Sequence, residues 1–171
     1  MAKRIRPGRC YREPHKAYTR VSKRKKGFIK AAPQPKIQIF EMGNKQNSFE
    51  KAVFLISDKD LEIRHQALEI ARITVNKFLR EKLGKENYFF KIFTYPHQIQ
   101  RENPMAYGHK ADRYGRGMSL SFGVPKHRAA KVSKGQKIMV VKVDEKNVSI
   151  AKQALKKASY KLPITYNFRI E

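Results

Sequence analysis

The pattern of apolar and polar residues predicts six strands along the chain. Lys36–Glu41 alternates polar with apolar side chains and precedes the turn pair Gly43-Asn44, as expected for a half-buried strand. The other predicted strands are apolar, aromatic or alternating runs of similar length at residues 51–57, 87–95, 118–123, 136–143 and 164–170. Pro96 ends the third of these six runs and Gly135 precedes the fifth, which places turns beside them.

Two segments have the apolar period of an amphipathic helix. The longer one is predicted from Asp58 to Leu83, because Ser57 and Asp60 are spaced as in a capping box and Gly84 provides a stop. Its expected core-facing residues are Leu61, Leu68, Ala71, Val75 and Phe78. The second helix is predicted at 147–158, ending before Pro163, with Val148, Ala151, Leu155 and Ala158 facing inward.

The order of these elements predicts the fold class and two parts of the chain. Strands flank two helices without a βαβ rhythm, which favours an α+β fold with a mainly antiparallel sheet. Residues 1–35 have no apolar period, and we interpret them as an extended arm that becomes ordered on a partner. Residues 97–117 also lack a period, and such a stretch inside a compact domain is usually functional or mobile. We therefore expect a basic arm at 1–35 and an α+β domain at 36–171 with a functional loop at 101–117.

The charge of the chain narrows the class of partner. The sequence has 39 Lys and Arg residues against 14 Asp and Glu, a formal net charge of +25, and such self-repulsion favours a polyanionic partner. Residues 1–30 carry a net charge of +11 and residues 101–137 a net charge of +7, so most of the excess lies on the least periodic segments. An anionic membrane is the rival partner, but no apolar run approaches the roughly 20 residues of a spanning helix.

The distribution of cations and aromatic rings favours RNA over DNA. Between 101 and 116, cations that suit phosphates are interleaved with flat rings that suit unpaired bases. The predicted long helix starts with acidic residues, which disfavours its use as a DNA-reading helix. The candidate phosphate-binding residues are Lys3, Arg4, Arg6, Arg9, Arg12, Lys16, Arg20, Lys23, Arg24, Lys25 and Lys26 in the arm, and Lys126, Arg128, Lys131 and Lys134 in the segment 126–137.

The residue types that carry catalysis or bind metals do not form a recognisable motif. Five histidines occur, at 15, 65, 97, 109 and 127, but none has the spacing of a metal-binding pair, and Cys10 is the only cysteine. We interpret His65 as a surface or boundary residue of the long helix. No phosphate-binding glycine loop is present, so we expect no cofactor, no metal and no small-molecule substrate. A free RNA-modifying or RNA-cleaving enzyme that uses His109 and Asp112, or a chromatin-like DNA-binding protein, remains an alternative.

Several segments in order along the chain resemble one ribosomal protein family. They are Arg6-Pro-Gly-Arg-Cys-Tyr-Arg, Pro35-Lys-Ile-Gln-Ile-Phe-Glu-Met-Gly, the helical segment 67–77, Ala111-Asp-Arg with Gly117-Met, Phe122-Gly-Val-Pro, and the segment 154–164. The chain is similar through almost its whole length to the universal large-subunit family called L-sixteen in bacteria and L-ten-e in archaea and eukaryotes. The sequence of the loop resembles the archaeal branch.

The resemblance implies a fold, a location and a set of partners. It implies a hammerhead-type α+β protein that is not an enzyme, in the large subunit of the cytoplasmic ribosome. The partners it implies are large-subunit (23S-type) rRNA near the 5S rRNA and the peptidyl transferase centre, neighbouring ribosomal proteins, and the acceptor end of tRNA, with no membrane. The loop 101–116 would contact the tRNA through Arg101, Tyr107, His109, Lys110, Asp112, Arg113, Tyr114 and Arg116. The family pattern Ala-Gly-Ala-Asp-Arg is replaced in its first part by Gly108-His109-Lys110.

Overall fold

A computed structural model describes residue 29 and residues 32–102, 124–163 and 166–171. Their strands form two antiparallel sheets. The larger sheet has the order β1-β4-β7-β2-β8 and the smaller one the order β3-β6-β5. The strands of the larger sheet are β1 (Glu41–Gly43), β2 (Lys51–Ser57), β4 (Phe89–Ile92), β7 (Lys137–Val143) and β8 (Tyr166–Ile170). Those of the smaller sheet are β3 (Leu61–Arg64), β5 (Gln98–Glu102) and β6 (Val124–Val132).

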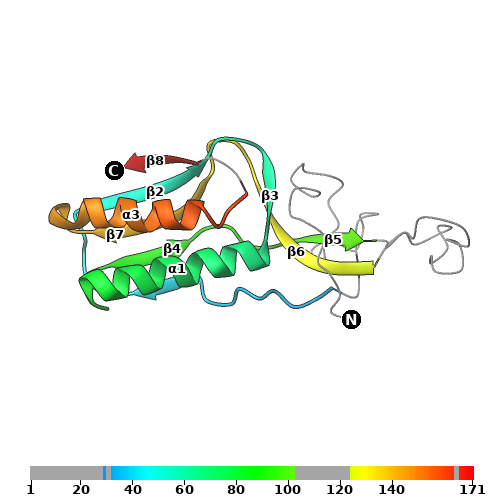
Figure 1. Cartoon of the computed structure of the whole chain (residues 1–171), viewed down its shortest axis with the longest axis horizontal. Coiled ribbons are helices and arrows are strands. Elements are labelled where there is room, and N and C mark those ends of the chain that lie inside the picture. Colours follow the sequence, from blue (N-terminus) through cyan, green and yellow to red (C-terminus); the bar gives the residue numbers. More distant parts are fainter. Residues whose placement is uncertain (1–28, 30–31, 103–123, 164–165) are drawn as a thin grey trace, which may run out of the picture.

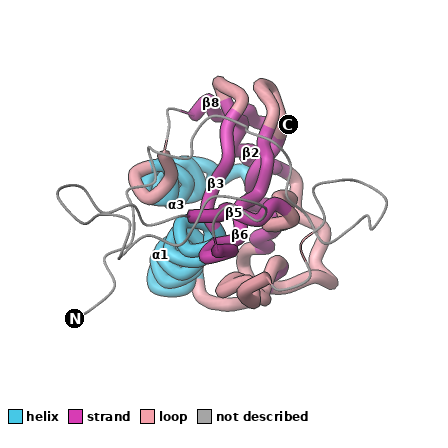
Figure 2. The backbone as a smooth tube through the Cα atoms, turned by 90° about the vertical axis from the view of Figure 1, so that its right-hand side faces the viewer, coloured by secondary structure: helices cyan, strands magenta, loops and turns pink. Residues whose placement is uncertain are grey.

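Two α-helices cover one face of the larger sheet. Helix α1 (His65–Leu83) and helix α3 (Val148–Ser159) pack against each other, and a short 3-10 helix, η2 (Glu145–Asn147), leads into α3. In Figure 1 both helices lie in front of the larger sheet, and Figure 2 shows them together on one side of the strands. The smaller sheet extends beyond the ends of the helices, to the right in Figure 1. None of the described helices covers the opposite face of the larger sheet.

The core lies between the helices and the larger sheet. In register, Val53 of β2 faces Val141 of β7, which faces Phe90 of β4, and all three side chains are fully buried. The helices contribute small and branched side chains to this layer, and burying such residues is worth roughly 1.5–3 kcal/mol for each large one. The buried residues of the helices are Leu68, Ala71, Val75 and Leu79 in α1 and Ala151, Ala154, Leu155 and Ala158 in α3.

The fold class and several elements agree with the prediction. All described strand pairs are antiparallel and the described residues contain two α-helices, which confirms the α+β class, although these strands form two sheets. The strand at 51–57 has the predicted bounds, and β7 and α3 each start one residue later than predicted. Strand β4 is shorter than predicted, and β8 covers the described residues 166–170 of the strand predicted at 164–170. The strand predicted at 118–123 lies outside the described residues.

The prediction for the first strand is wrong over most of its length. Strand β1 covers only Glu41–Gly43, and residues 36–40 belong to no ladder apart from one hydrogen bond from the Ile92 backbone N–H to the Phe40 carbonyl (2.9 Å). Ile37 is fully buried but Ile39 is exposed, so the alternation in sequence does not correspond to alternating burial. Gly43 then has a φ of +88°, and the Asn44 N–H donates to the Tyr88 carbonyl (2.9 Å).

The predicted start of the long helix is also wrong. Helix α1 begins at His65, and Leu61 and Ile63 belong to strand β3, where they pair with Val132 and Ala130 of β6. Ser57 and Asp60 do not form a capping box, because the Ser57 hydroxyl donates to the Lys59 carbonyl and Asp60 accepts the Lys134 N–H. The first turn of α1 contains no acidic residue, so the argument against DNA based on acidic residues there fails.

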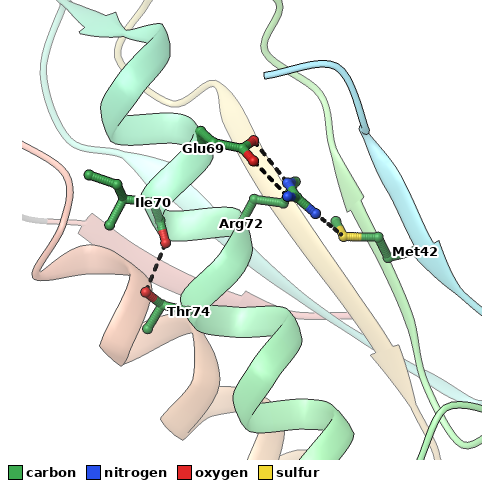
Figure 3. A network of polar contacts seen from close by, with 5 residues as sticks. All are labelled: Met42, Glu69, Ile70, Arg72 and Thr74. Atoms are coloured by element: carbon green, nitrogen blue, oxygen red, sulfur yellow. Dashed lines mark hydrogen bonds and ion pairs between the residues drawn. The ribbon is translucent and has the colours of Figure 1, made fainter. Parts of the chain in front are cut away.

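An arginine of α1 forms an ion pair within the helix and also contacts the edge strand β1 of the larger sheet (Figure 3). The Arg72 guanidinium donates to both carboxylate oxygens of Glu69, at 2.9 and 2.6 Å, and to the sulfur of Met42 in β1 at 3.2 Å. The hydrogen bonds to Glu69 raise the pKa of Arg72. Because the Arg72 side chain is mostly buried, this contact fixes the position of the helix against β1.

Candidate nucleic-acid interface

The smaller sheet joins the two ends of the predicted functional loop. Strand β5 ends at Glu102 and strand β6 begins at Val124, and these two residues are paired in register. The loop prediction was wrong for residues 98–102, which form β5, so Arg101 lies in a strand. The segment between Glu102 and Val124 therefore leaves and re-enters the fold at adjacent positions of one sheet.

The end of the predicted arm and the first residue after it are attached to the same sheet. Arg128 of β6 donates from Nε to the carbonyl of Pro33 at 2.7 Å, and the Lys36 N–H donates to Nδ1 of His65 at 2.8 Å. His65 directly follows β3. Both of the most basic parts of the sequence are thus connected to the described structure at the smaller sheet.

Strand β6 was not predicted, and its four candidate cations have different surroundings. Lys126 forms an ion pair with Glu102 (3.0 Å), and Arg128 is held by the Pro33 carbonyl. Lys131 and Lys134 have exposed side chains at the far end of the strand and in the turn after it. Gly135, with a φ of +77°, completes this turn. Lys131 and Lys134 are therefore the members of this group whose charges are presented to solvent.

Strand pairing places a polar network on one face of the smaller sheet. Arg64 of β3 donates from Nε to Gln100 Oε1 (3.0 Å), and the Gln100 amide nitrogen donates to Glu62 (3.1 Å). These hydrogen bonds link β3 to β5 across β6. They hold the strands together without a bound ligand, and we therefore interpret the network as structural and not as a binding site.

His65 is buried and not at the surface, contrary to the sequence interpretation. Its side chain is 3% exposed, and its ring lies 6.1 Å from that of His127. Burial is the main cause that lowers the pKa of His65 to about 4, and His127, Lys36, Arg128 and Arg64 nearby contribute to this shift. Burial also lowers the pKa of His127. Both rings are therefore neutral at pH 7, and their positions suit packing at the junction of β3, β6 and α1.

Most of the other predicted site residues belong to the arm and to the loop. All of the arm candidates, Lys3 to Lys26, and the loop candidates from Tyr107 to Arg116 lie outside the described residues. Within the described ranges, no group of three or more His, Cys, Asp or Glu side chains is arranged to hold a metal ion. No helix in the described part of the chain has the length and apolarity needed to cross a membrane.

One candidate surface was missed by the sequence analysis. Three rings, those of Phe93, Tyr95 and His97, are exposed at alternate positions of the segment that connects β4 to β5. The alternation of aromatic residues at 93, 95 and 97 was visible in the sequence, but it was included in a predicted strand that ended at Tyr95.

These features define a basic α+β protein whose most charged segments are attached at one small sheet. Comparison with known proteins identifies its family. The family described as "Ribosomal protein L16p/L10e" matches residues 15–169. The chain is 47% identical over 161 residues to the large ribosomal subunit protein uL16 of Methanococcus aeolicus, which covers 94% of this chain and 90% of that protein. It is 46% identical over 160 residues to the uL16 protein of Methanococcus maripaludis, covering 93% and 90% of the two chains.

The chain therefore belongs to the ribosomal protein L16p/L10e family. The similarity to Methanococcus proteins confirms the predicted archaeal-type member. Family membership also confirms that the protein is a structural constituent of the large subunit of the cytoplasmic ribosome and not an enzyme.

Proposed function

We propose that the protein binds large-subunit rRNA through its N-terminal arm and the end of β6, close to the 5S rRNA and the peptidyl transferase centre. In this proposal the chain has two parts, the arm at 1–35 and the α+β domain at 36–171, and the loop 101–116 contacts the acceptor end of tRNA. The assignment of the rRNA region and of the tRNA contact rests on the family resemblance. The assignment of the binding segments rests on charge and on the attachment of those segments.

One observation carries the proposal. The segment from 103 to 123 is bounded by the paired residues Glu102 and Val124, and Pro33, near the end of the arm, is bound by Arg128 of the same sheet. The arm and the region 101–137 together supply +18 of the net charge of +25. Positive charges attached to one end of a fold can contact many phosphates of one folded RNA. Each such contact releases condensed counterions, and this release favours binding.

The salt dependence of rRNA binding tests the charged segment of β6. The double variant Lys131→Ala, Lys134→Ala removes two exposed cations, and we expect the slope of log K against log salt for a 23S-type rRNA fragment to fall by about two. The loss of affinity should be similar for RNA fragments of different sequence, because phosphate contacts do not read bases.

The matched control is Lys152→Ala, Lys156→Ala, which removes the same charge from the exposed side of α3. This variant should leave the slope almost unchanged. Equal effects of the two double variants would show that only the total charge matters, and the assignment of the interface to β6 would then be wrong.

A further inference from the structure

The segment that connects the two sheets presents three aromatic rings to solvent. After β4 ends at Ile92, the side chains of Phe93 (45% exposed) and Tyr95 (41% exposed) point outward, and His97 is also exposed. Thr94, at 3% exposure, and Pro96 lie inward between them. Phe93 and Tyr95 are alternate residues, and the His97 N–H donates to the Tyr95 carbonyl (2.9 Å), a tight turn at Pro96 that leaves the rings of Tyr95 and His97 4.6 Å apart. We call Phe93, Tyr95 and His97 the aromatic row.

The rings of the aromatic row are supported from behind and from the side. The Phe93 ring is stacked with that of Phe54 at 6.5 Å, with 18° between the planes. The Tyr95 ring lies 5.4 Å from Phe40 and 4.6 Å from His97. These contacts hold exposed rings in place. Rings that are already held in place suit a stacking surface, because binding of a base then costs less free energy for ordering the side chains.

Two lysines lie beside Phe93 and its stacking partner Phe54. The ammonium group of Lys91 lies 5.9 Å from the Phe93 ring, and that of Lys137 lies 3.8 Å from the Phe54 ring. Each of these lysines also forms an ion pair with a carboxylate, Lys91 with Glu41 and Lys137 with Glu171. Both pairs are exposed to water and therefore worth little, so a phosphate can compete for the ammonium groups.

We infer that the aromatic row is a stacking platform for unpaired bases of a single-stranded or irregular RNA segment. The inference rests on the proposed function, since it takes rRNA as the ligand. Exposed flat rings offer a surface to any base, and adjacent lysines attract the phosphates that connect successive bases. A protein partner would bury these rings equally well, but the +25 charge and the cations beside them favour RNA. The row also leads directly into β5, which contains Arg101.

Tryptophan fluorescence tests the platform directly, because the chain contains no tryptophan. In the full-length protein, Phe93→Trp places the only indole in the aromatic row. We expect single-stranded oligoadenylate to quench its emission through base stacking. Heparin, a polyanion without bases, should bind the protein and leave the emission almost unchanged. Equal quenching by both polyanions would overturn the inference.

Loss of individual rings tests the contribution to affinity. Phe93→Leu and Tyr95→Leu keep an apolar side chain and remove the flat ring, and each should weaken oligoadenylate binding roughly tenfold. Tyr160→Leu is the matched control, because Tyr160 is 70% exposed at the end of α3, away from the row. It should change the dissociation constant by less than about twofold. Circular dichroism of each variant shows that the fold is kept.

The outcomes separate this inference from the proposed function. Anisotropy of a labelled 23S-type rRNA fragment measures rRNA binding separately. If the fragment binds, but RNA does not quench the Phe93→Trp variant and the leucine variants keep the wild-type affinity, the stacking platform is wrong and rRNA binding stands. If the fragment does not bind at all, both fail. If the emission changes only when the protein is assembled with other ribosomal proteins, a protein covers the row and the inference is overturned.

Discussion

Gly43 is the position at which one added methyl group should be most damaging to the fold. Its φ of +88° is a conformation that costs an alanine about 1–2 kcal/mol. A Cβ atom there would also overlap the carbonyl oxygen of Tyr88 and lie 3.1 Å from the Tyr88 carbonyl carbon. Since this neighbour is backbone of the chain that leads into β4, relief requires the strands β1 and β4 to separate. Such overpacking costs about 1–3 kcal/mol more. We expect Gly43→Ala to lower the free energy of unfolding by about 2–5 kcal/mol.

Gly135→Ala is the matched control for this prediction. Gly135 has a similar φ of +77°, but no heavy atom lies within 4 Å of its ideal Cβ position. The control should lose only the conformational contribution, about 1–2 kcal/mol. Urea unfolding followed by far-ultraviolet circular dichroism measures both variants without the added salt of guanidinium. Equal losses in the two variants would refute the close approach of Gly43 to Tyr88.

Three further predictions concern the buried ring of His65, the ion pair between Glu69 and Arg72, and the proposed loop. Because the pKa of His65 in the folded state is lowered to about 4, stability should fall as the pH decreases from about 6.5 to 4, by up to about 3 kcal/mol. His65→Gln should reduce this loss in urea titrations at pH 7 and 4.5, and an unchanged pH dependence would contradict the burial of the ring. Glu69→Gln should cost about 1–2 kcal/mol, because it leaves the guanidinium of Arg72 mostly buried without its anion, whereas replacing both residues by apolar ones should recover most of the loss. Alanine at both Arg113 and Arg116 should impair peptide-bond formation or tRNA binding more than incorporation into large subunits, and normal translation by fully occupied variant ribosomes would exclude a role for the loop.

Local patterns in the sequence were sufficient for elements whose burial follows one period. Helix α3 is of this kind, and strands β2 and β7 were found because each is an apolar run of strand length in which consecutive residues are buried. The start of α1 could not be predicted in this way. Leu61 fits the helix stripe of Leu68 and Ala71, but Ile63, two residues on, fits a strand, and the strand is formed by pairing with Val132 and Ala130, about 70 residues away in sequence.

The candidate interface was predicted in outline, from charge, but not in detail. The sequence shows that residues 126–134 are basic, but not that they form the middle strand of a sheet. It also does not show that Lys126 is paired with Glu102, because that ion pair joins residues on either side of a long connection. The burial of His65 could not be predicted for the same reason, because its neighbours His127 and Lys36 come from segments that are distant in the sequence.

Co-sedimentation of the full-length protein with large ribosomal subunits through a high-salt gradient tests the central claim most directly. A constituent held by many phosphate contacts together with shape fit to folded rRNA should remain in the large-subunit fractions. Removal of the protein from the subunits at a salt concentration that leaves other ribosomal proteins in place would mark it as a loose basic adduct and contradict the account.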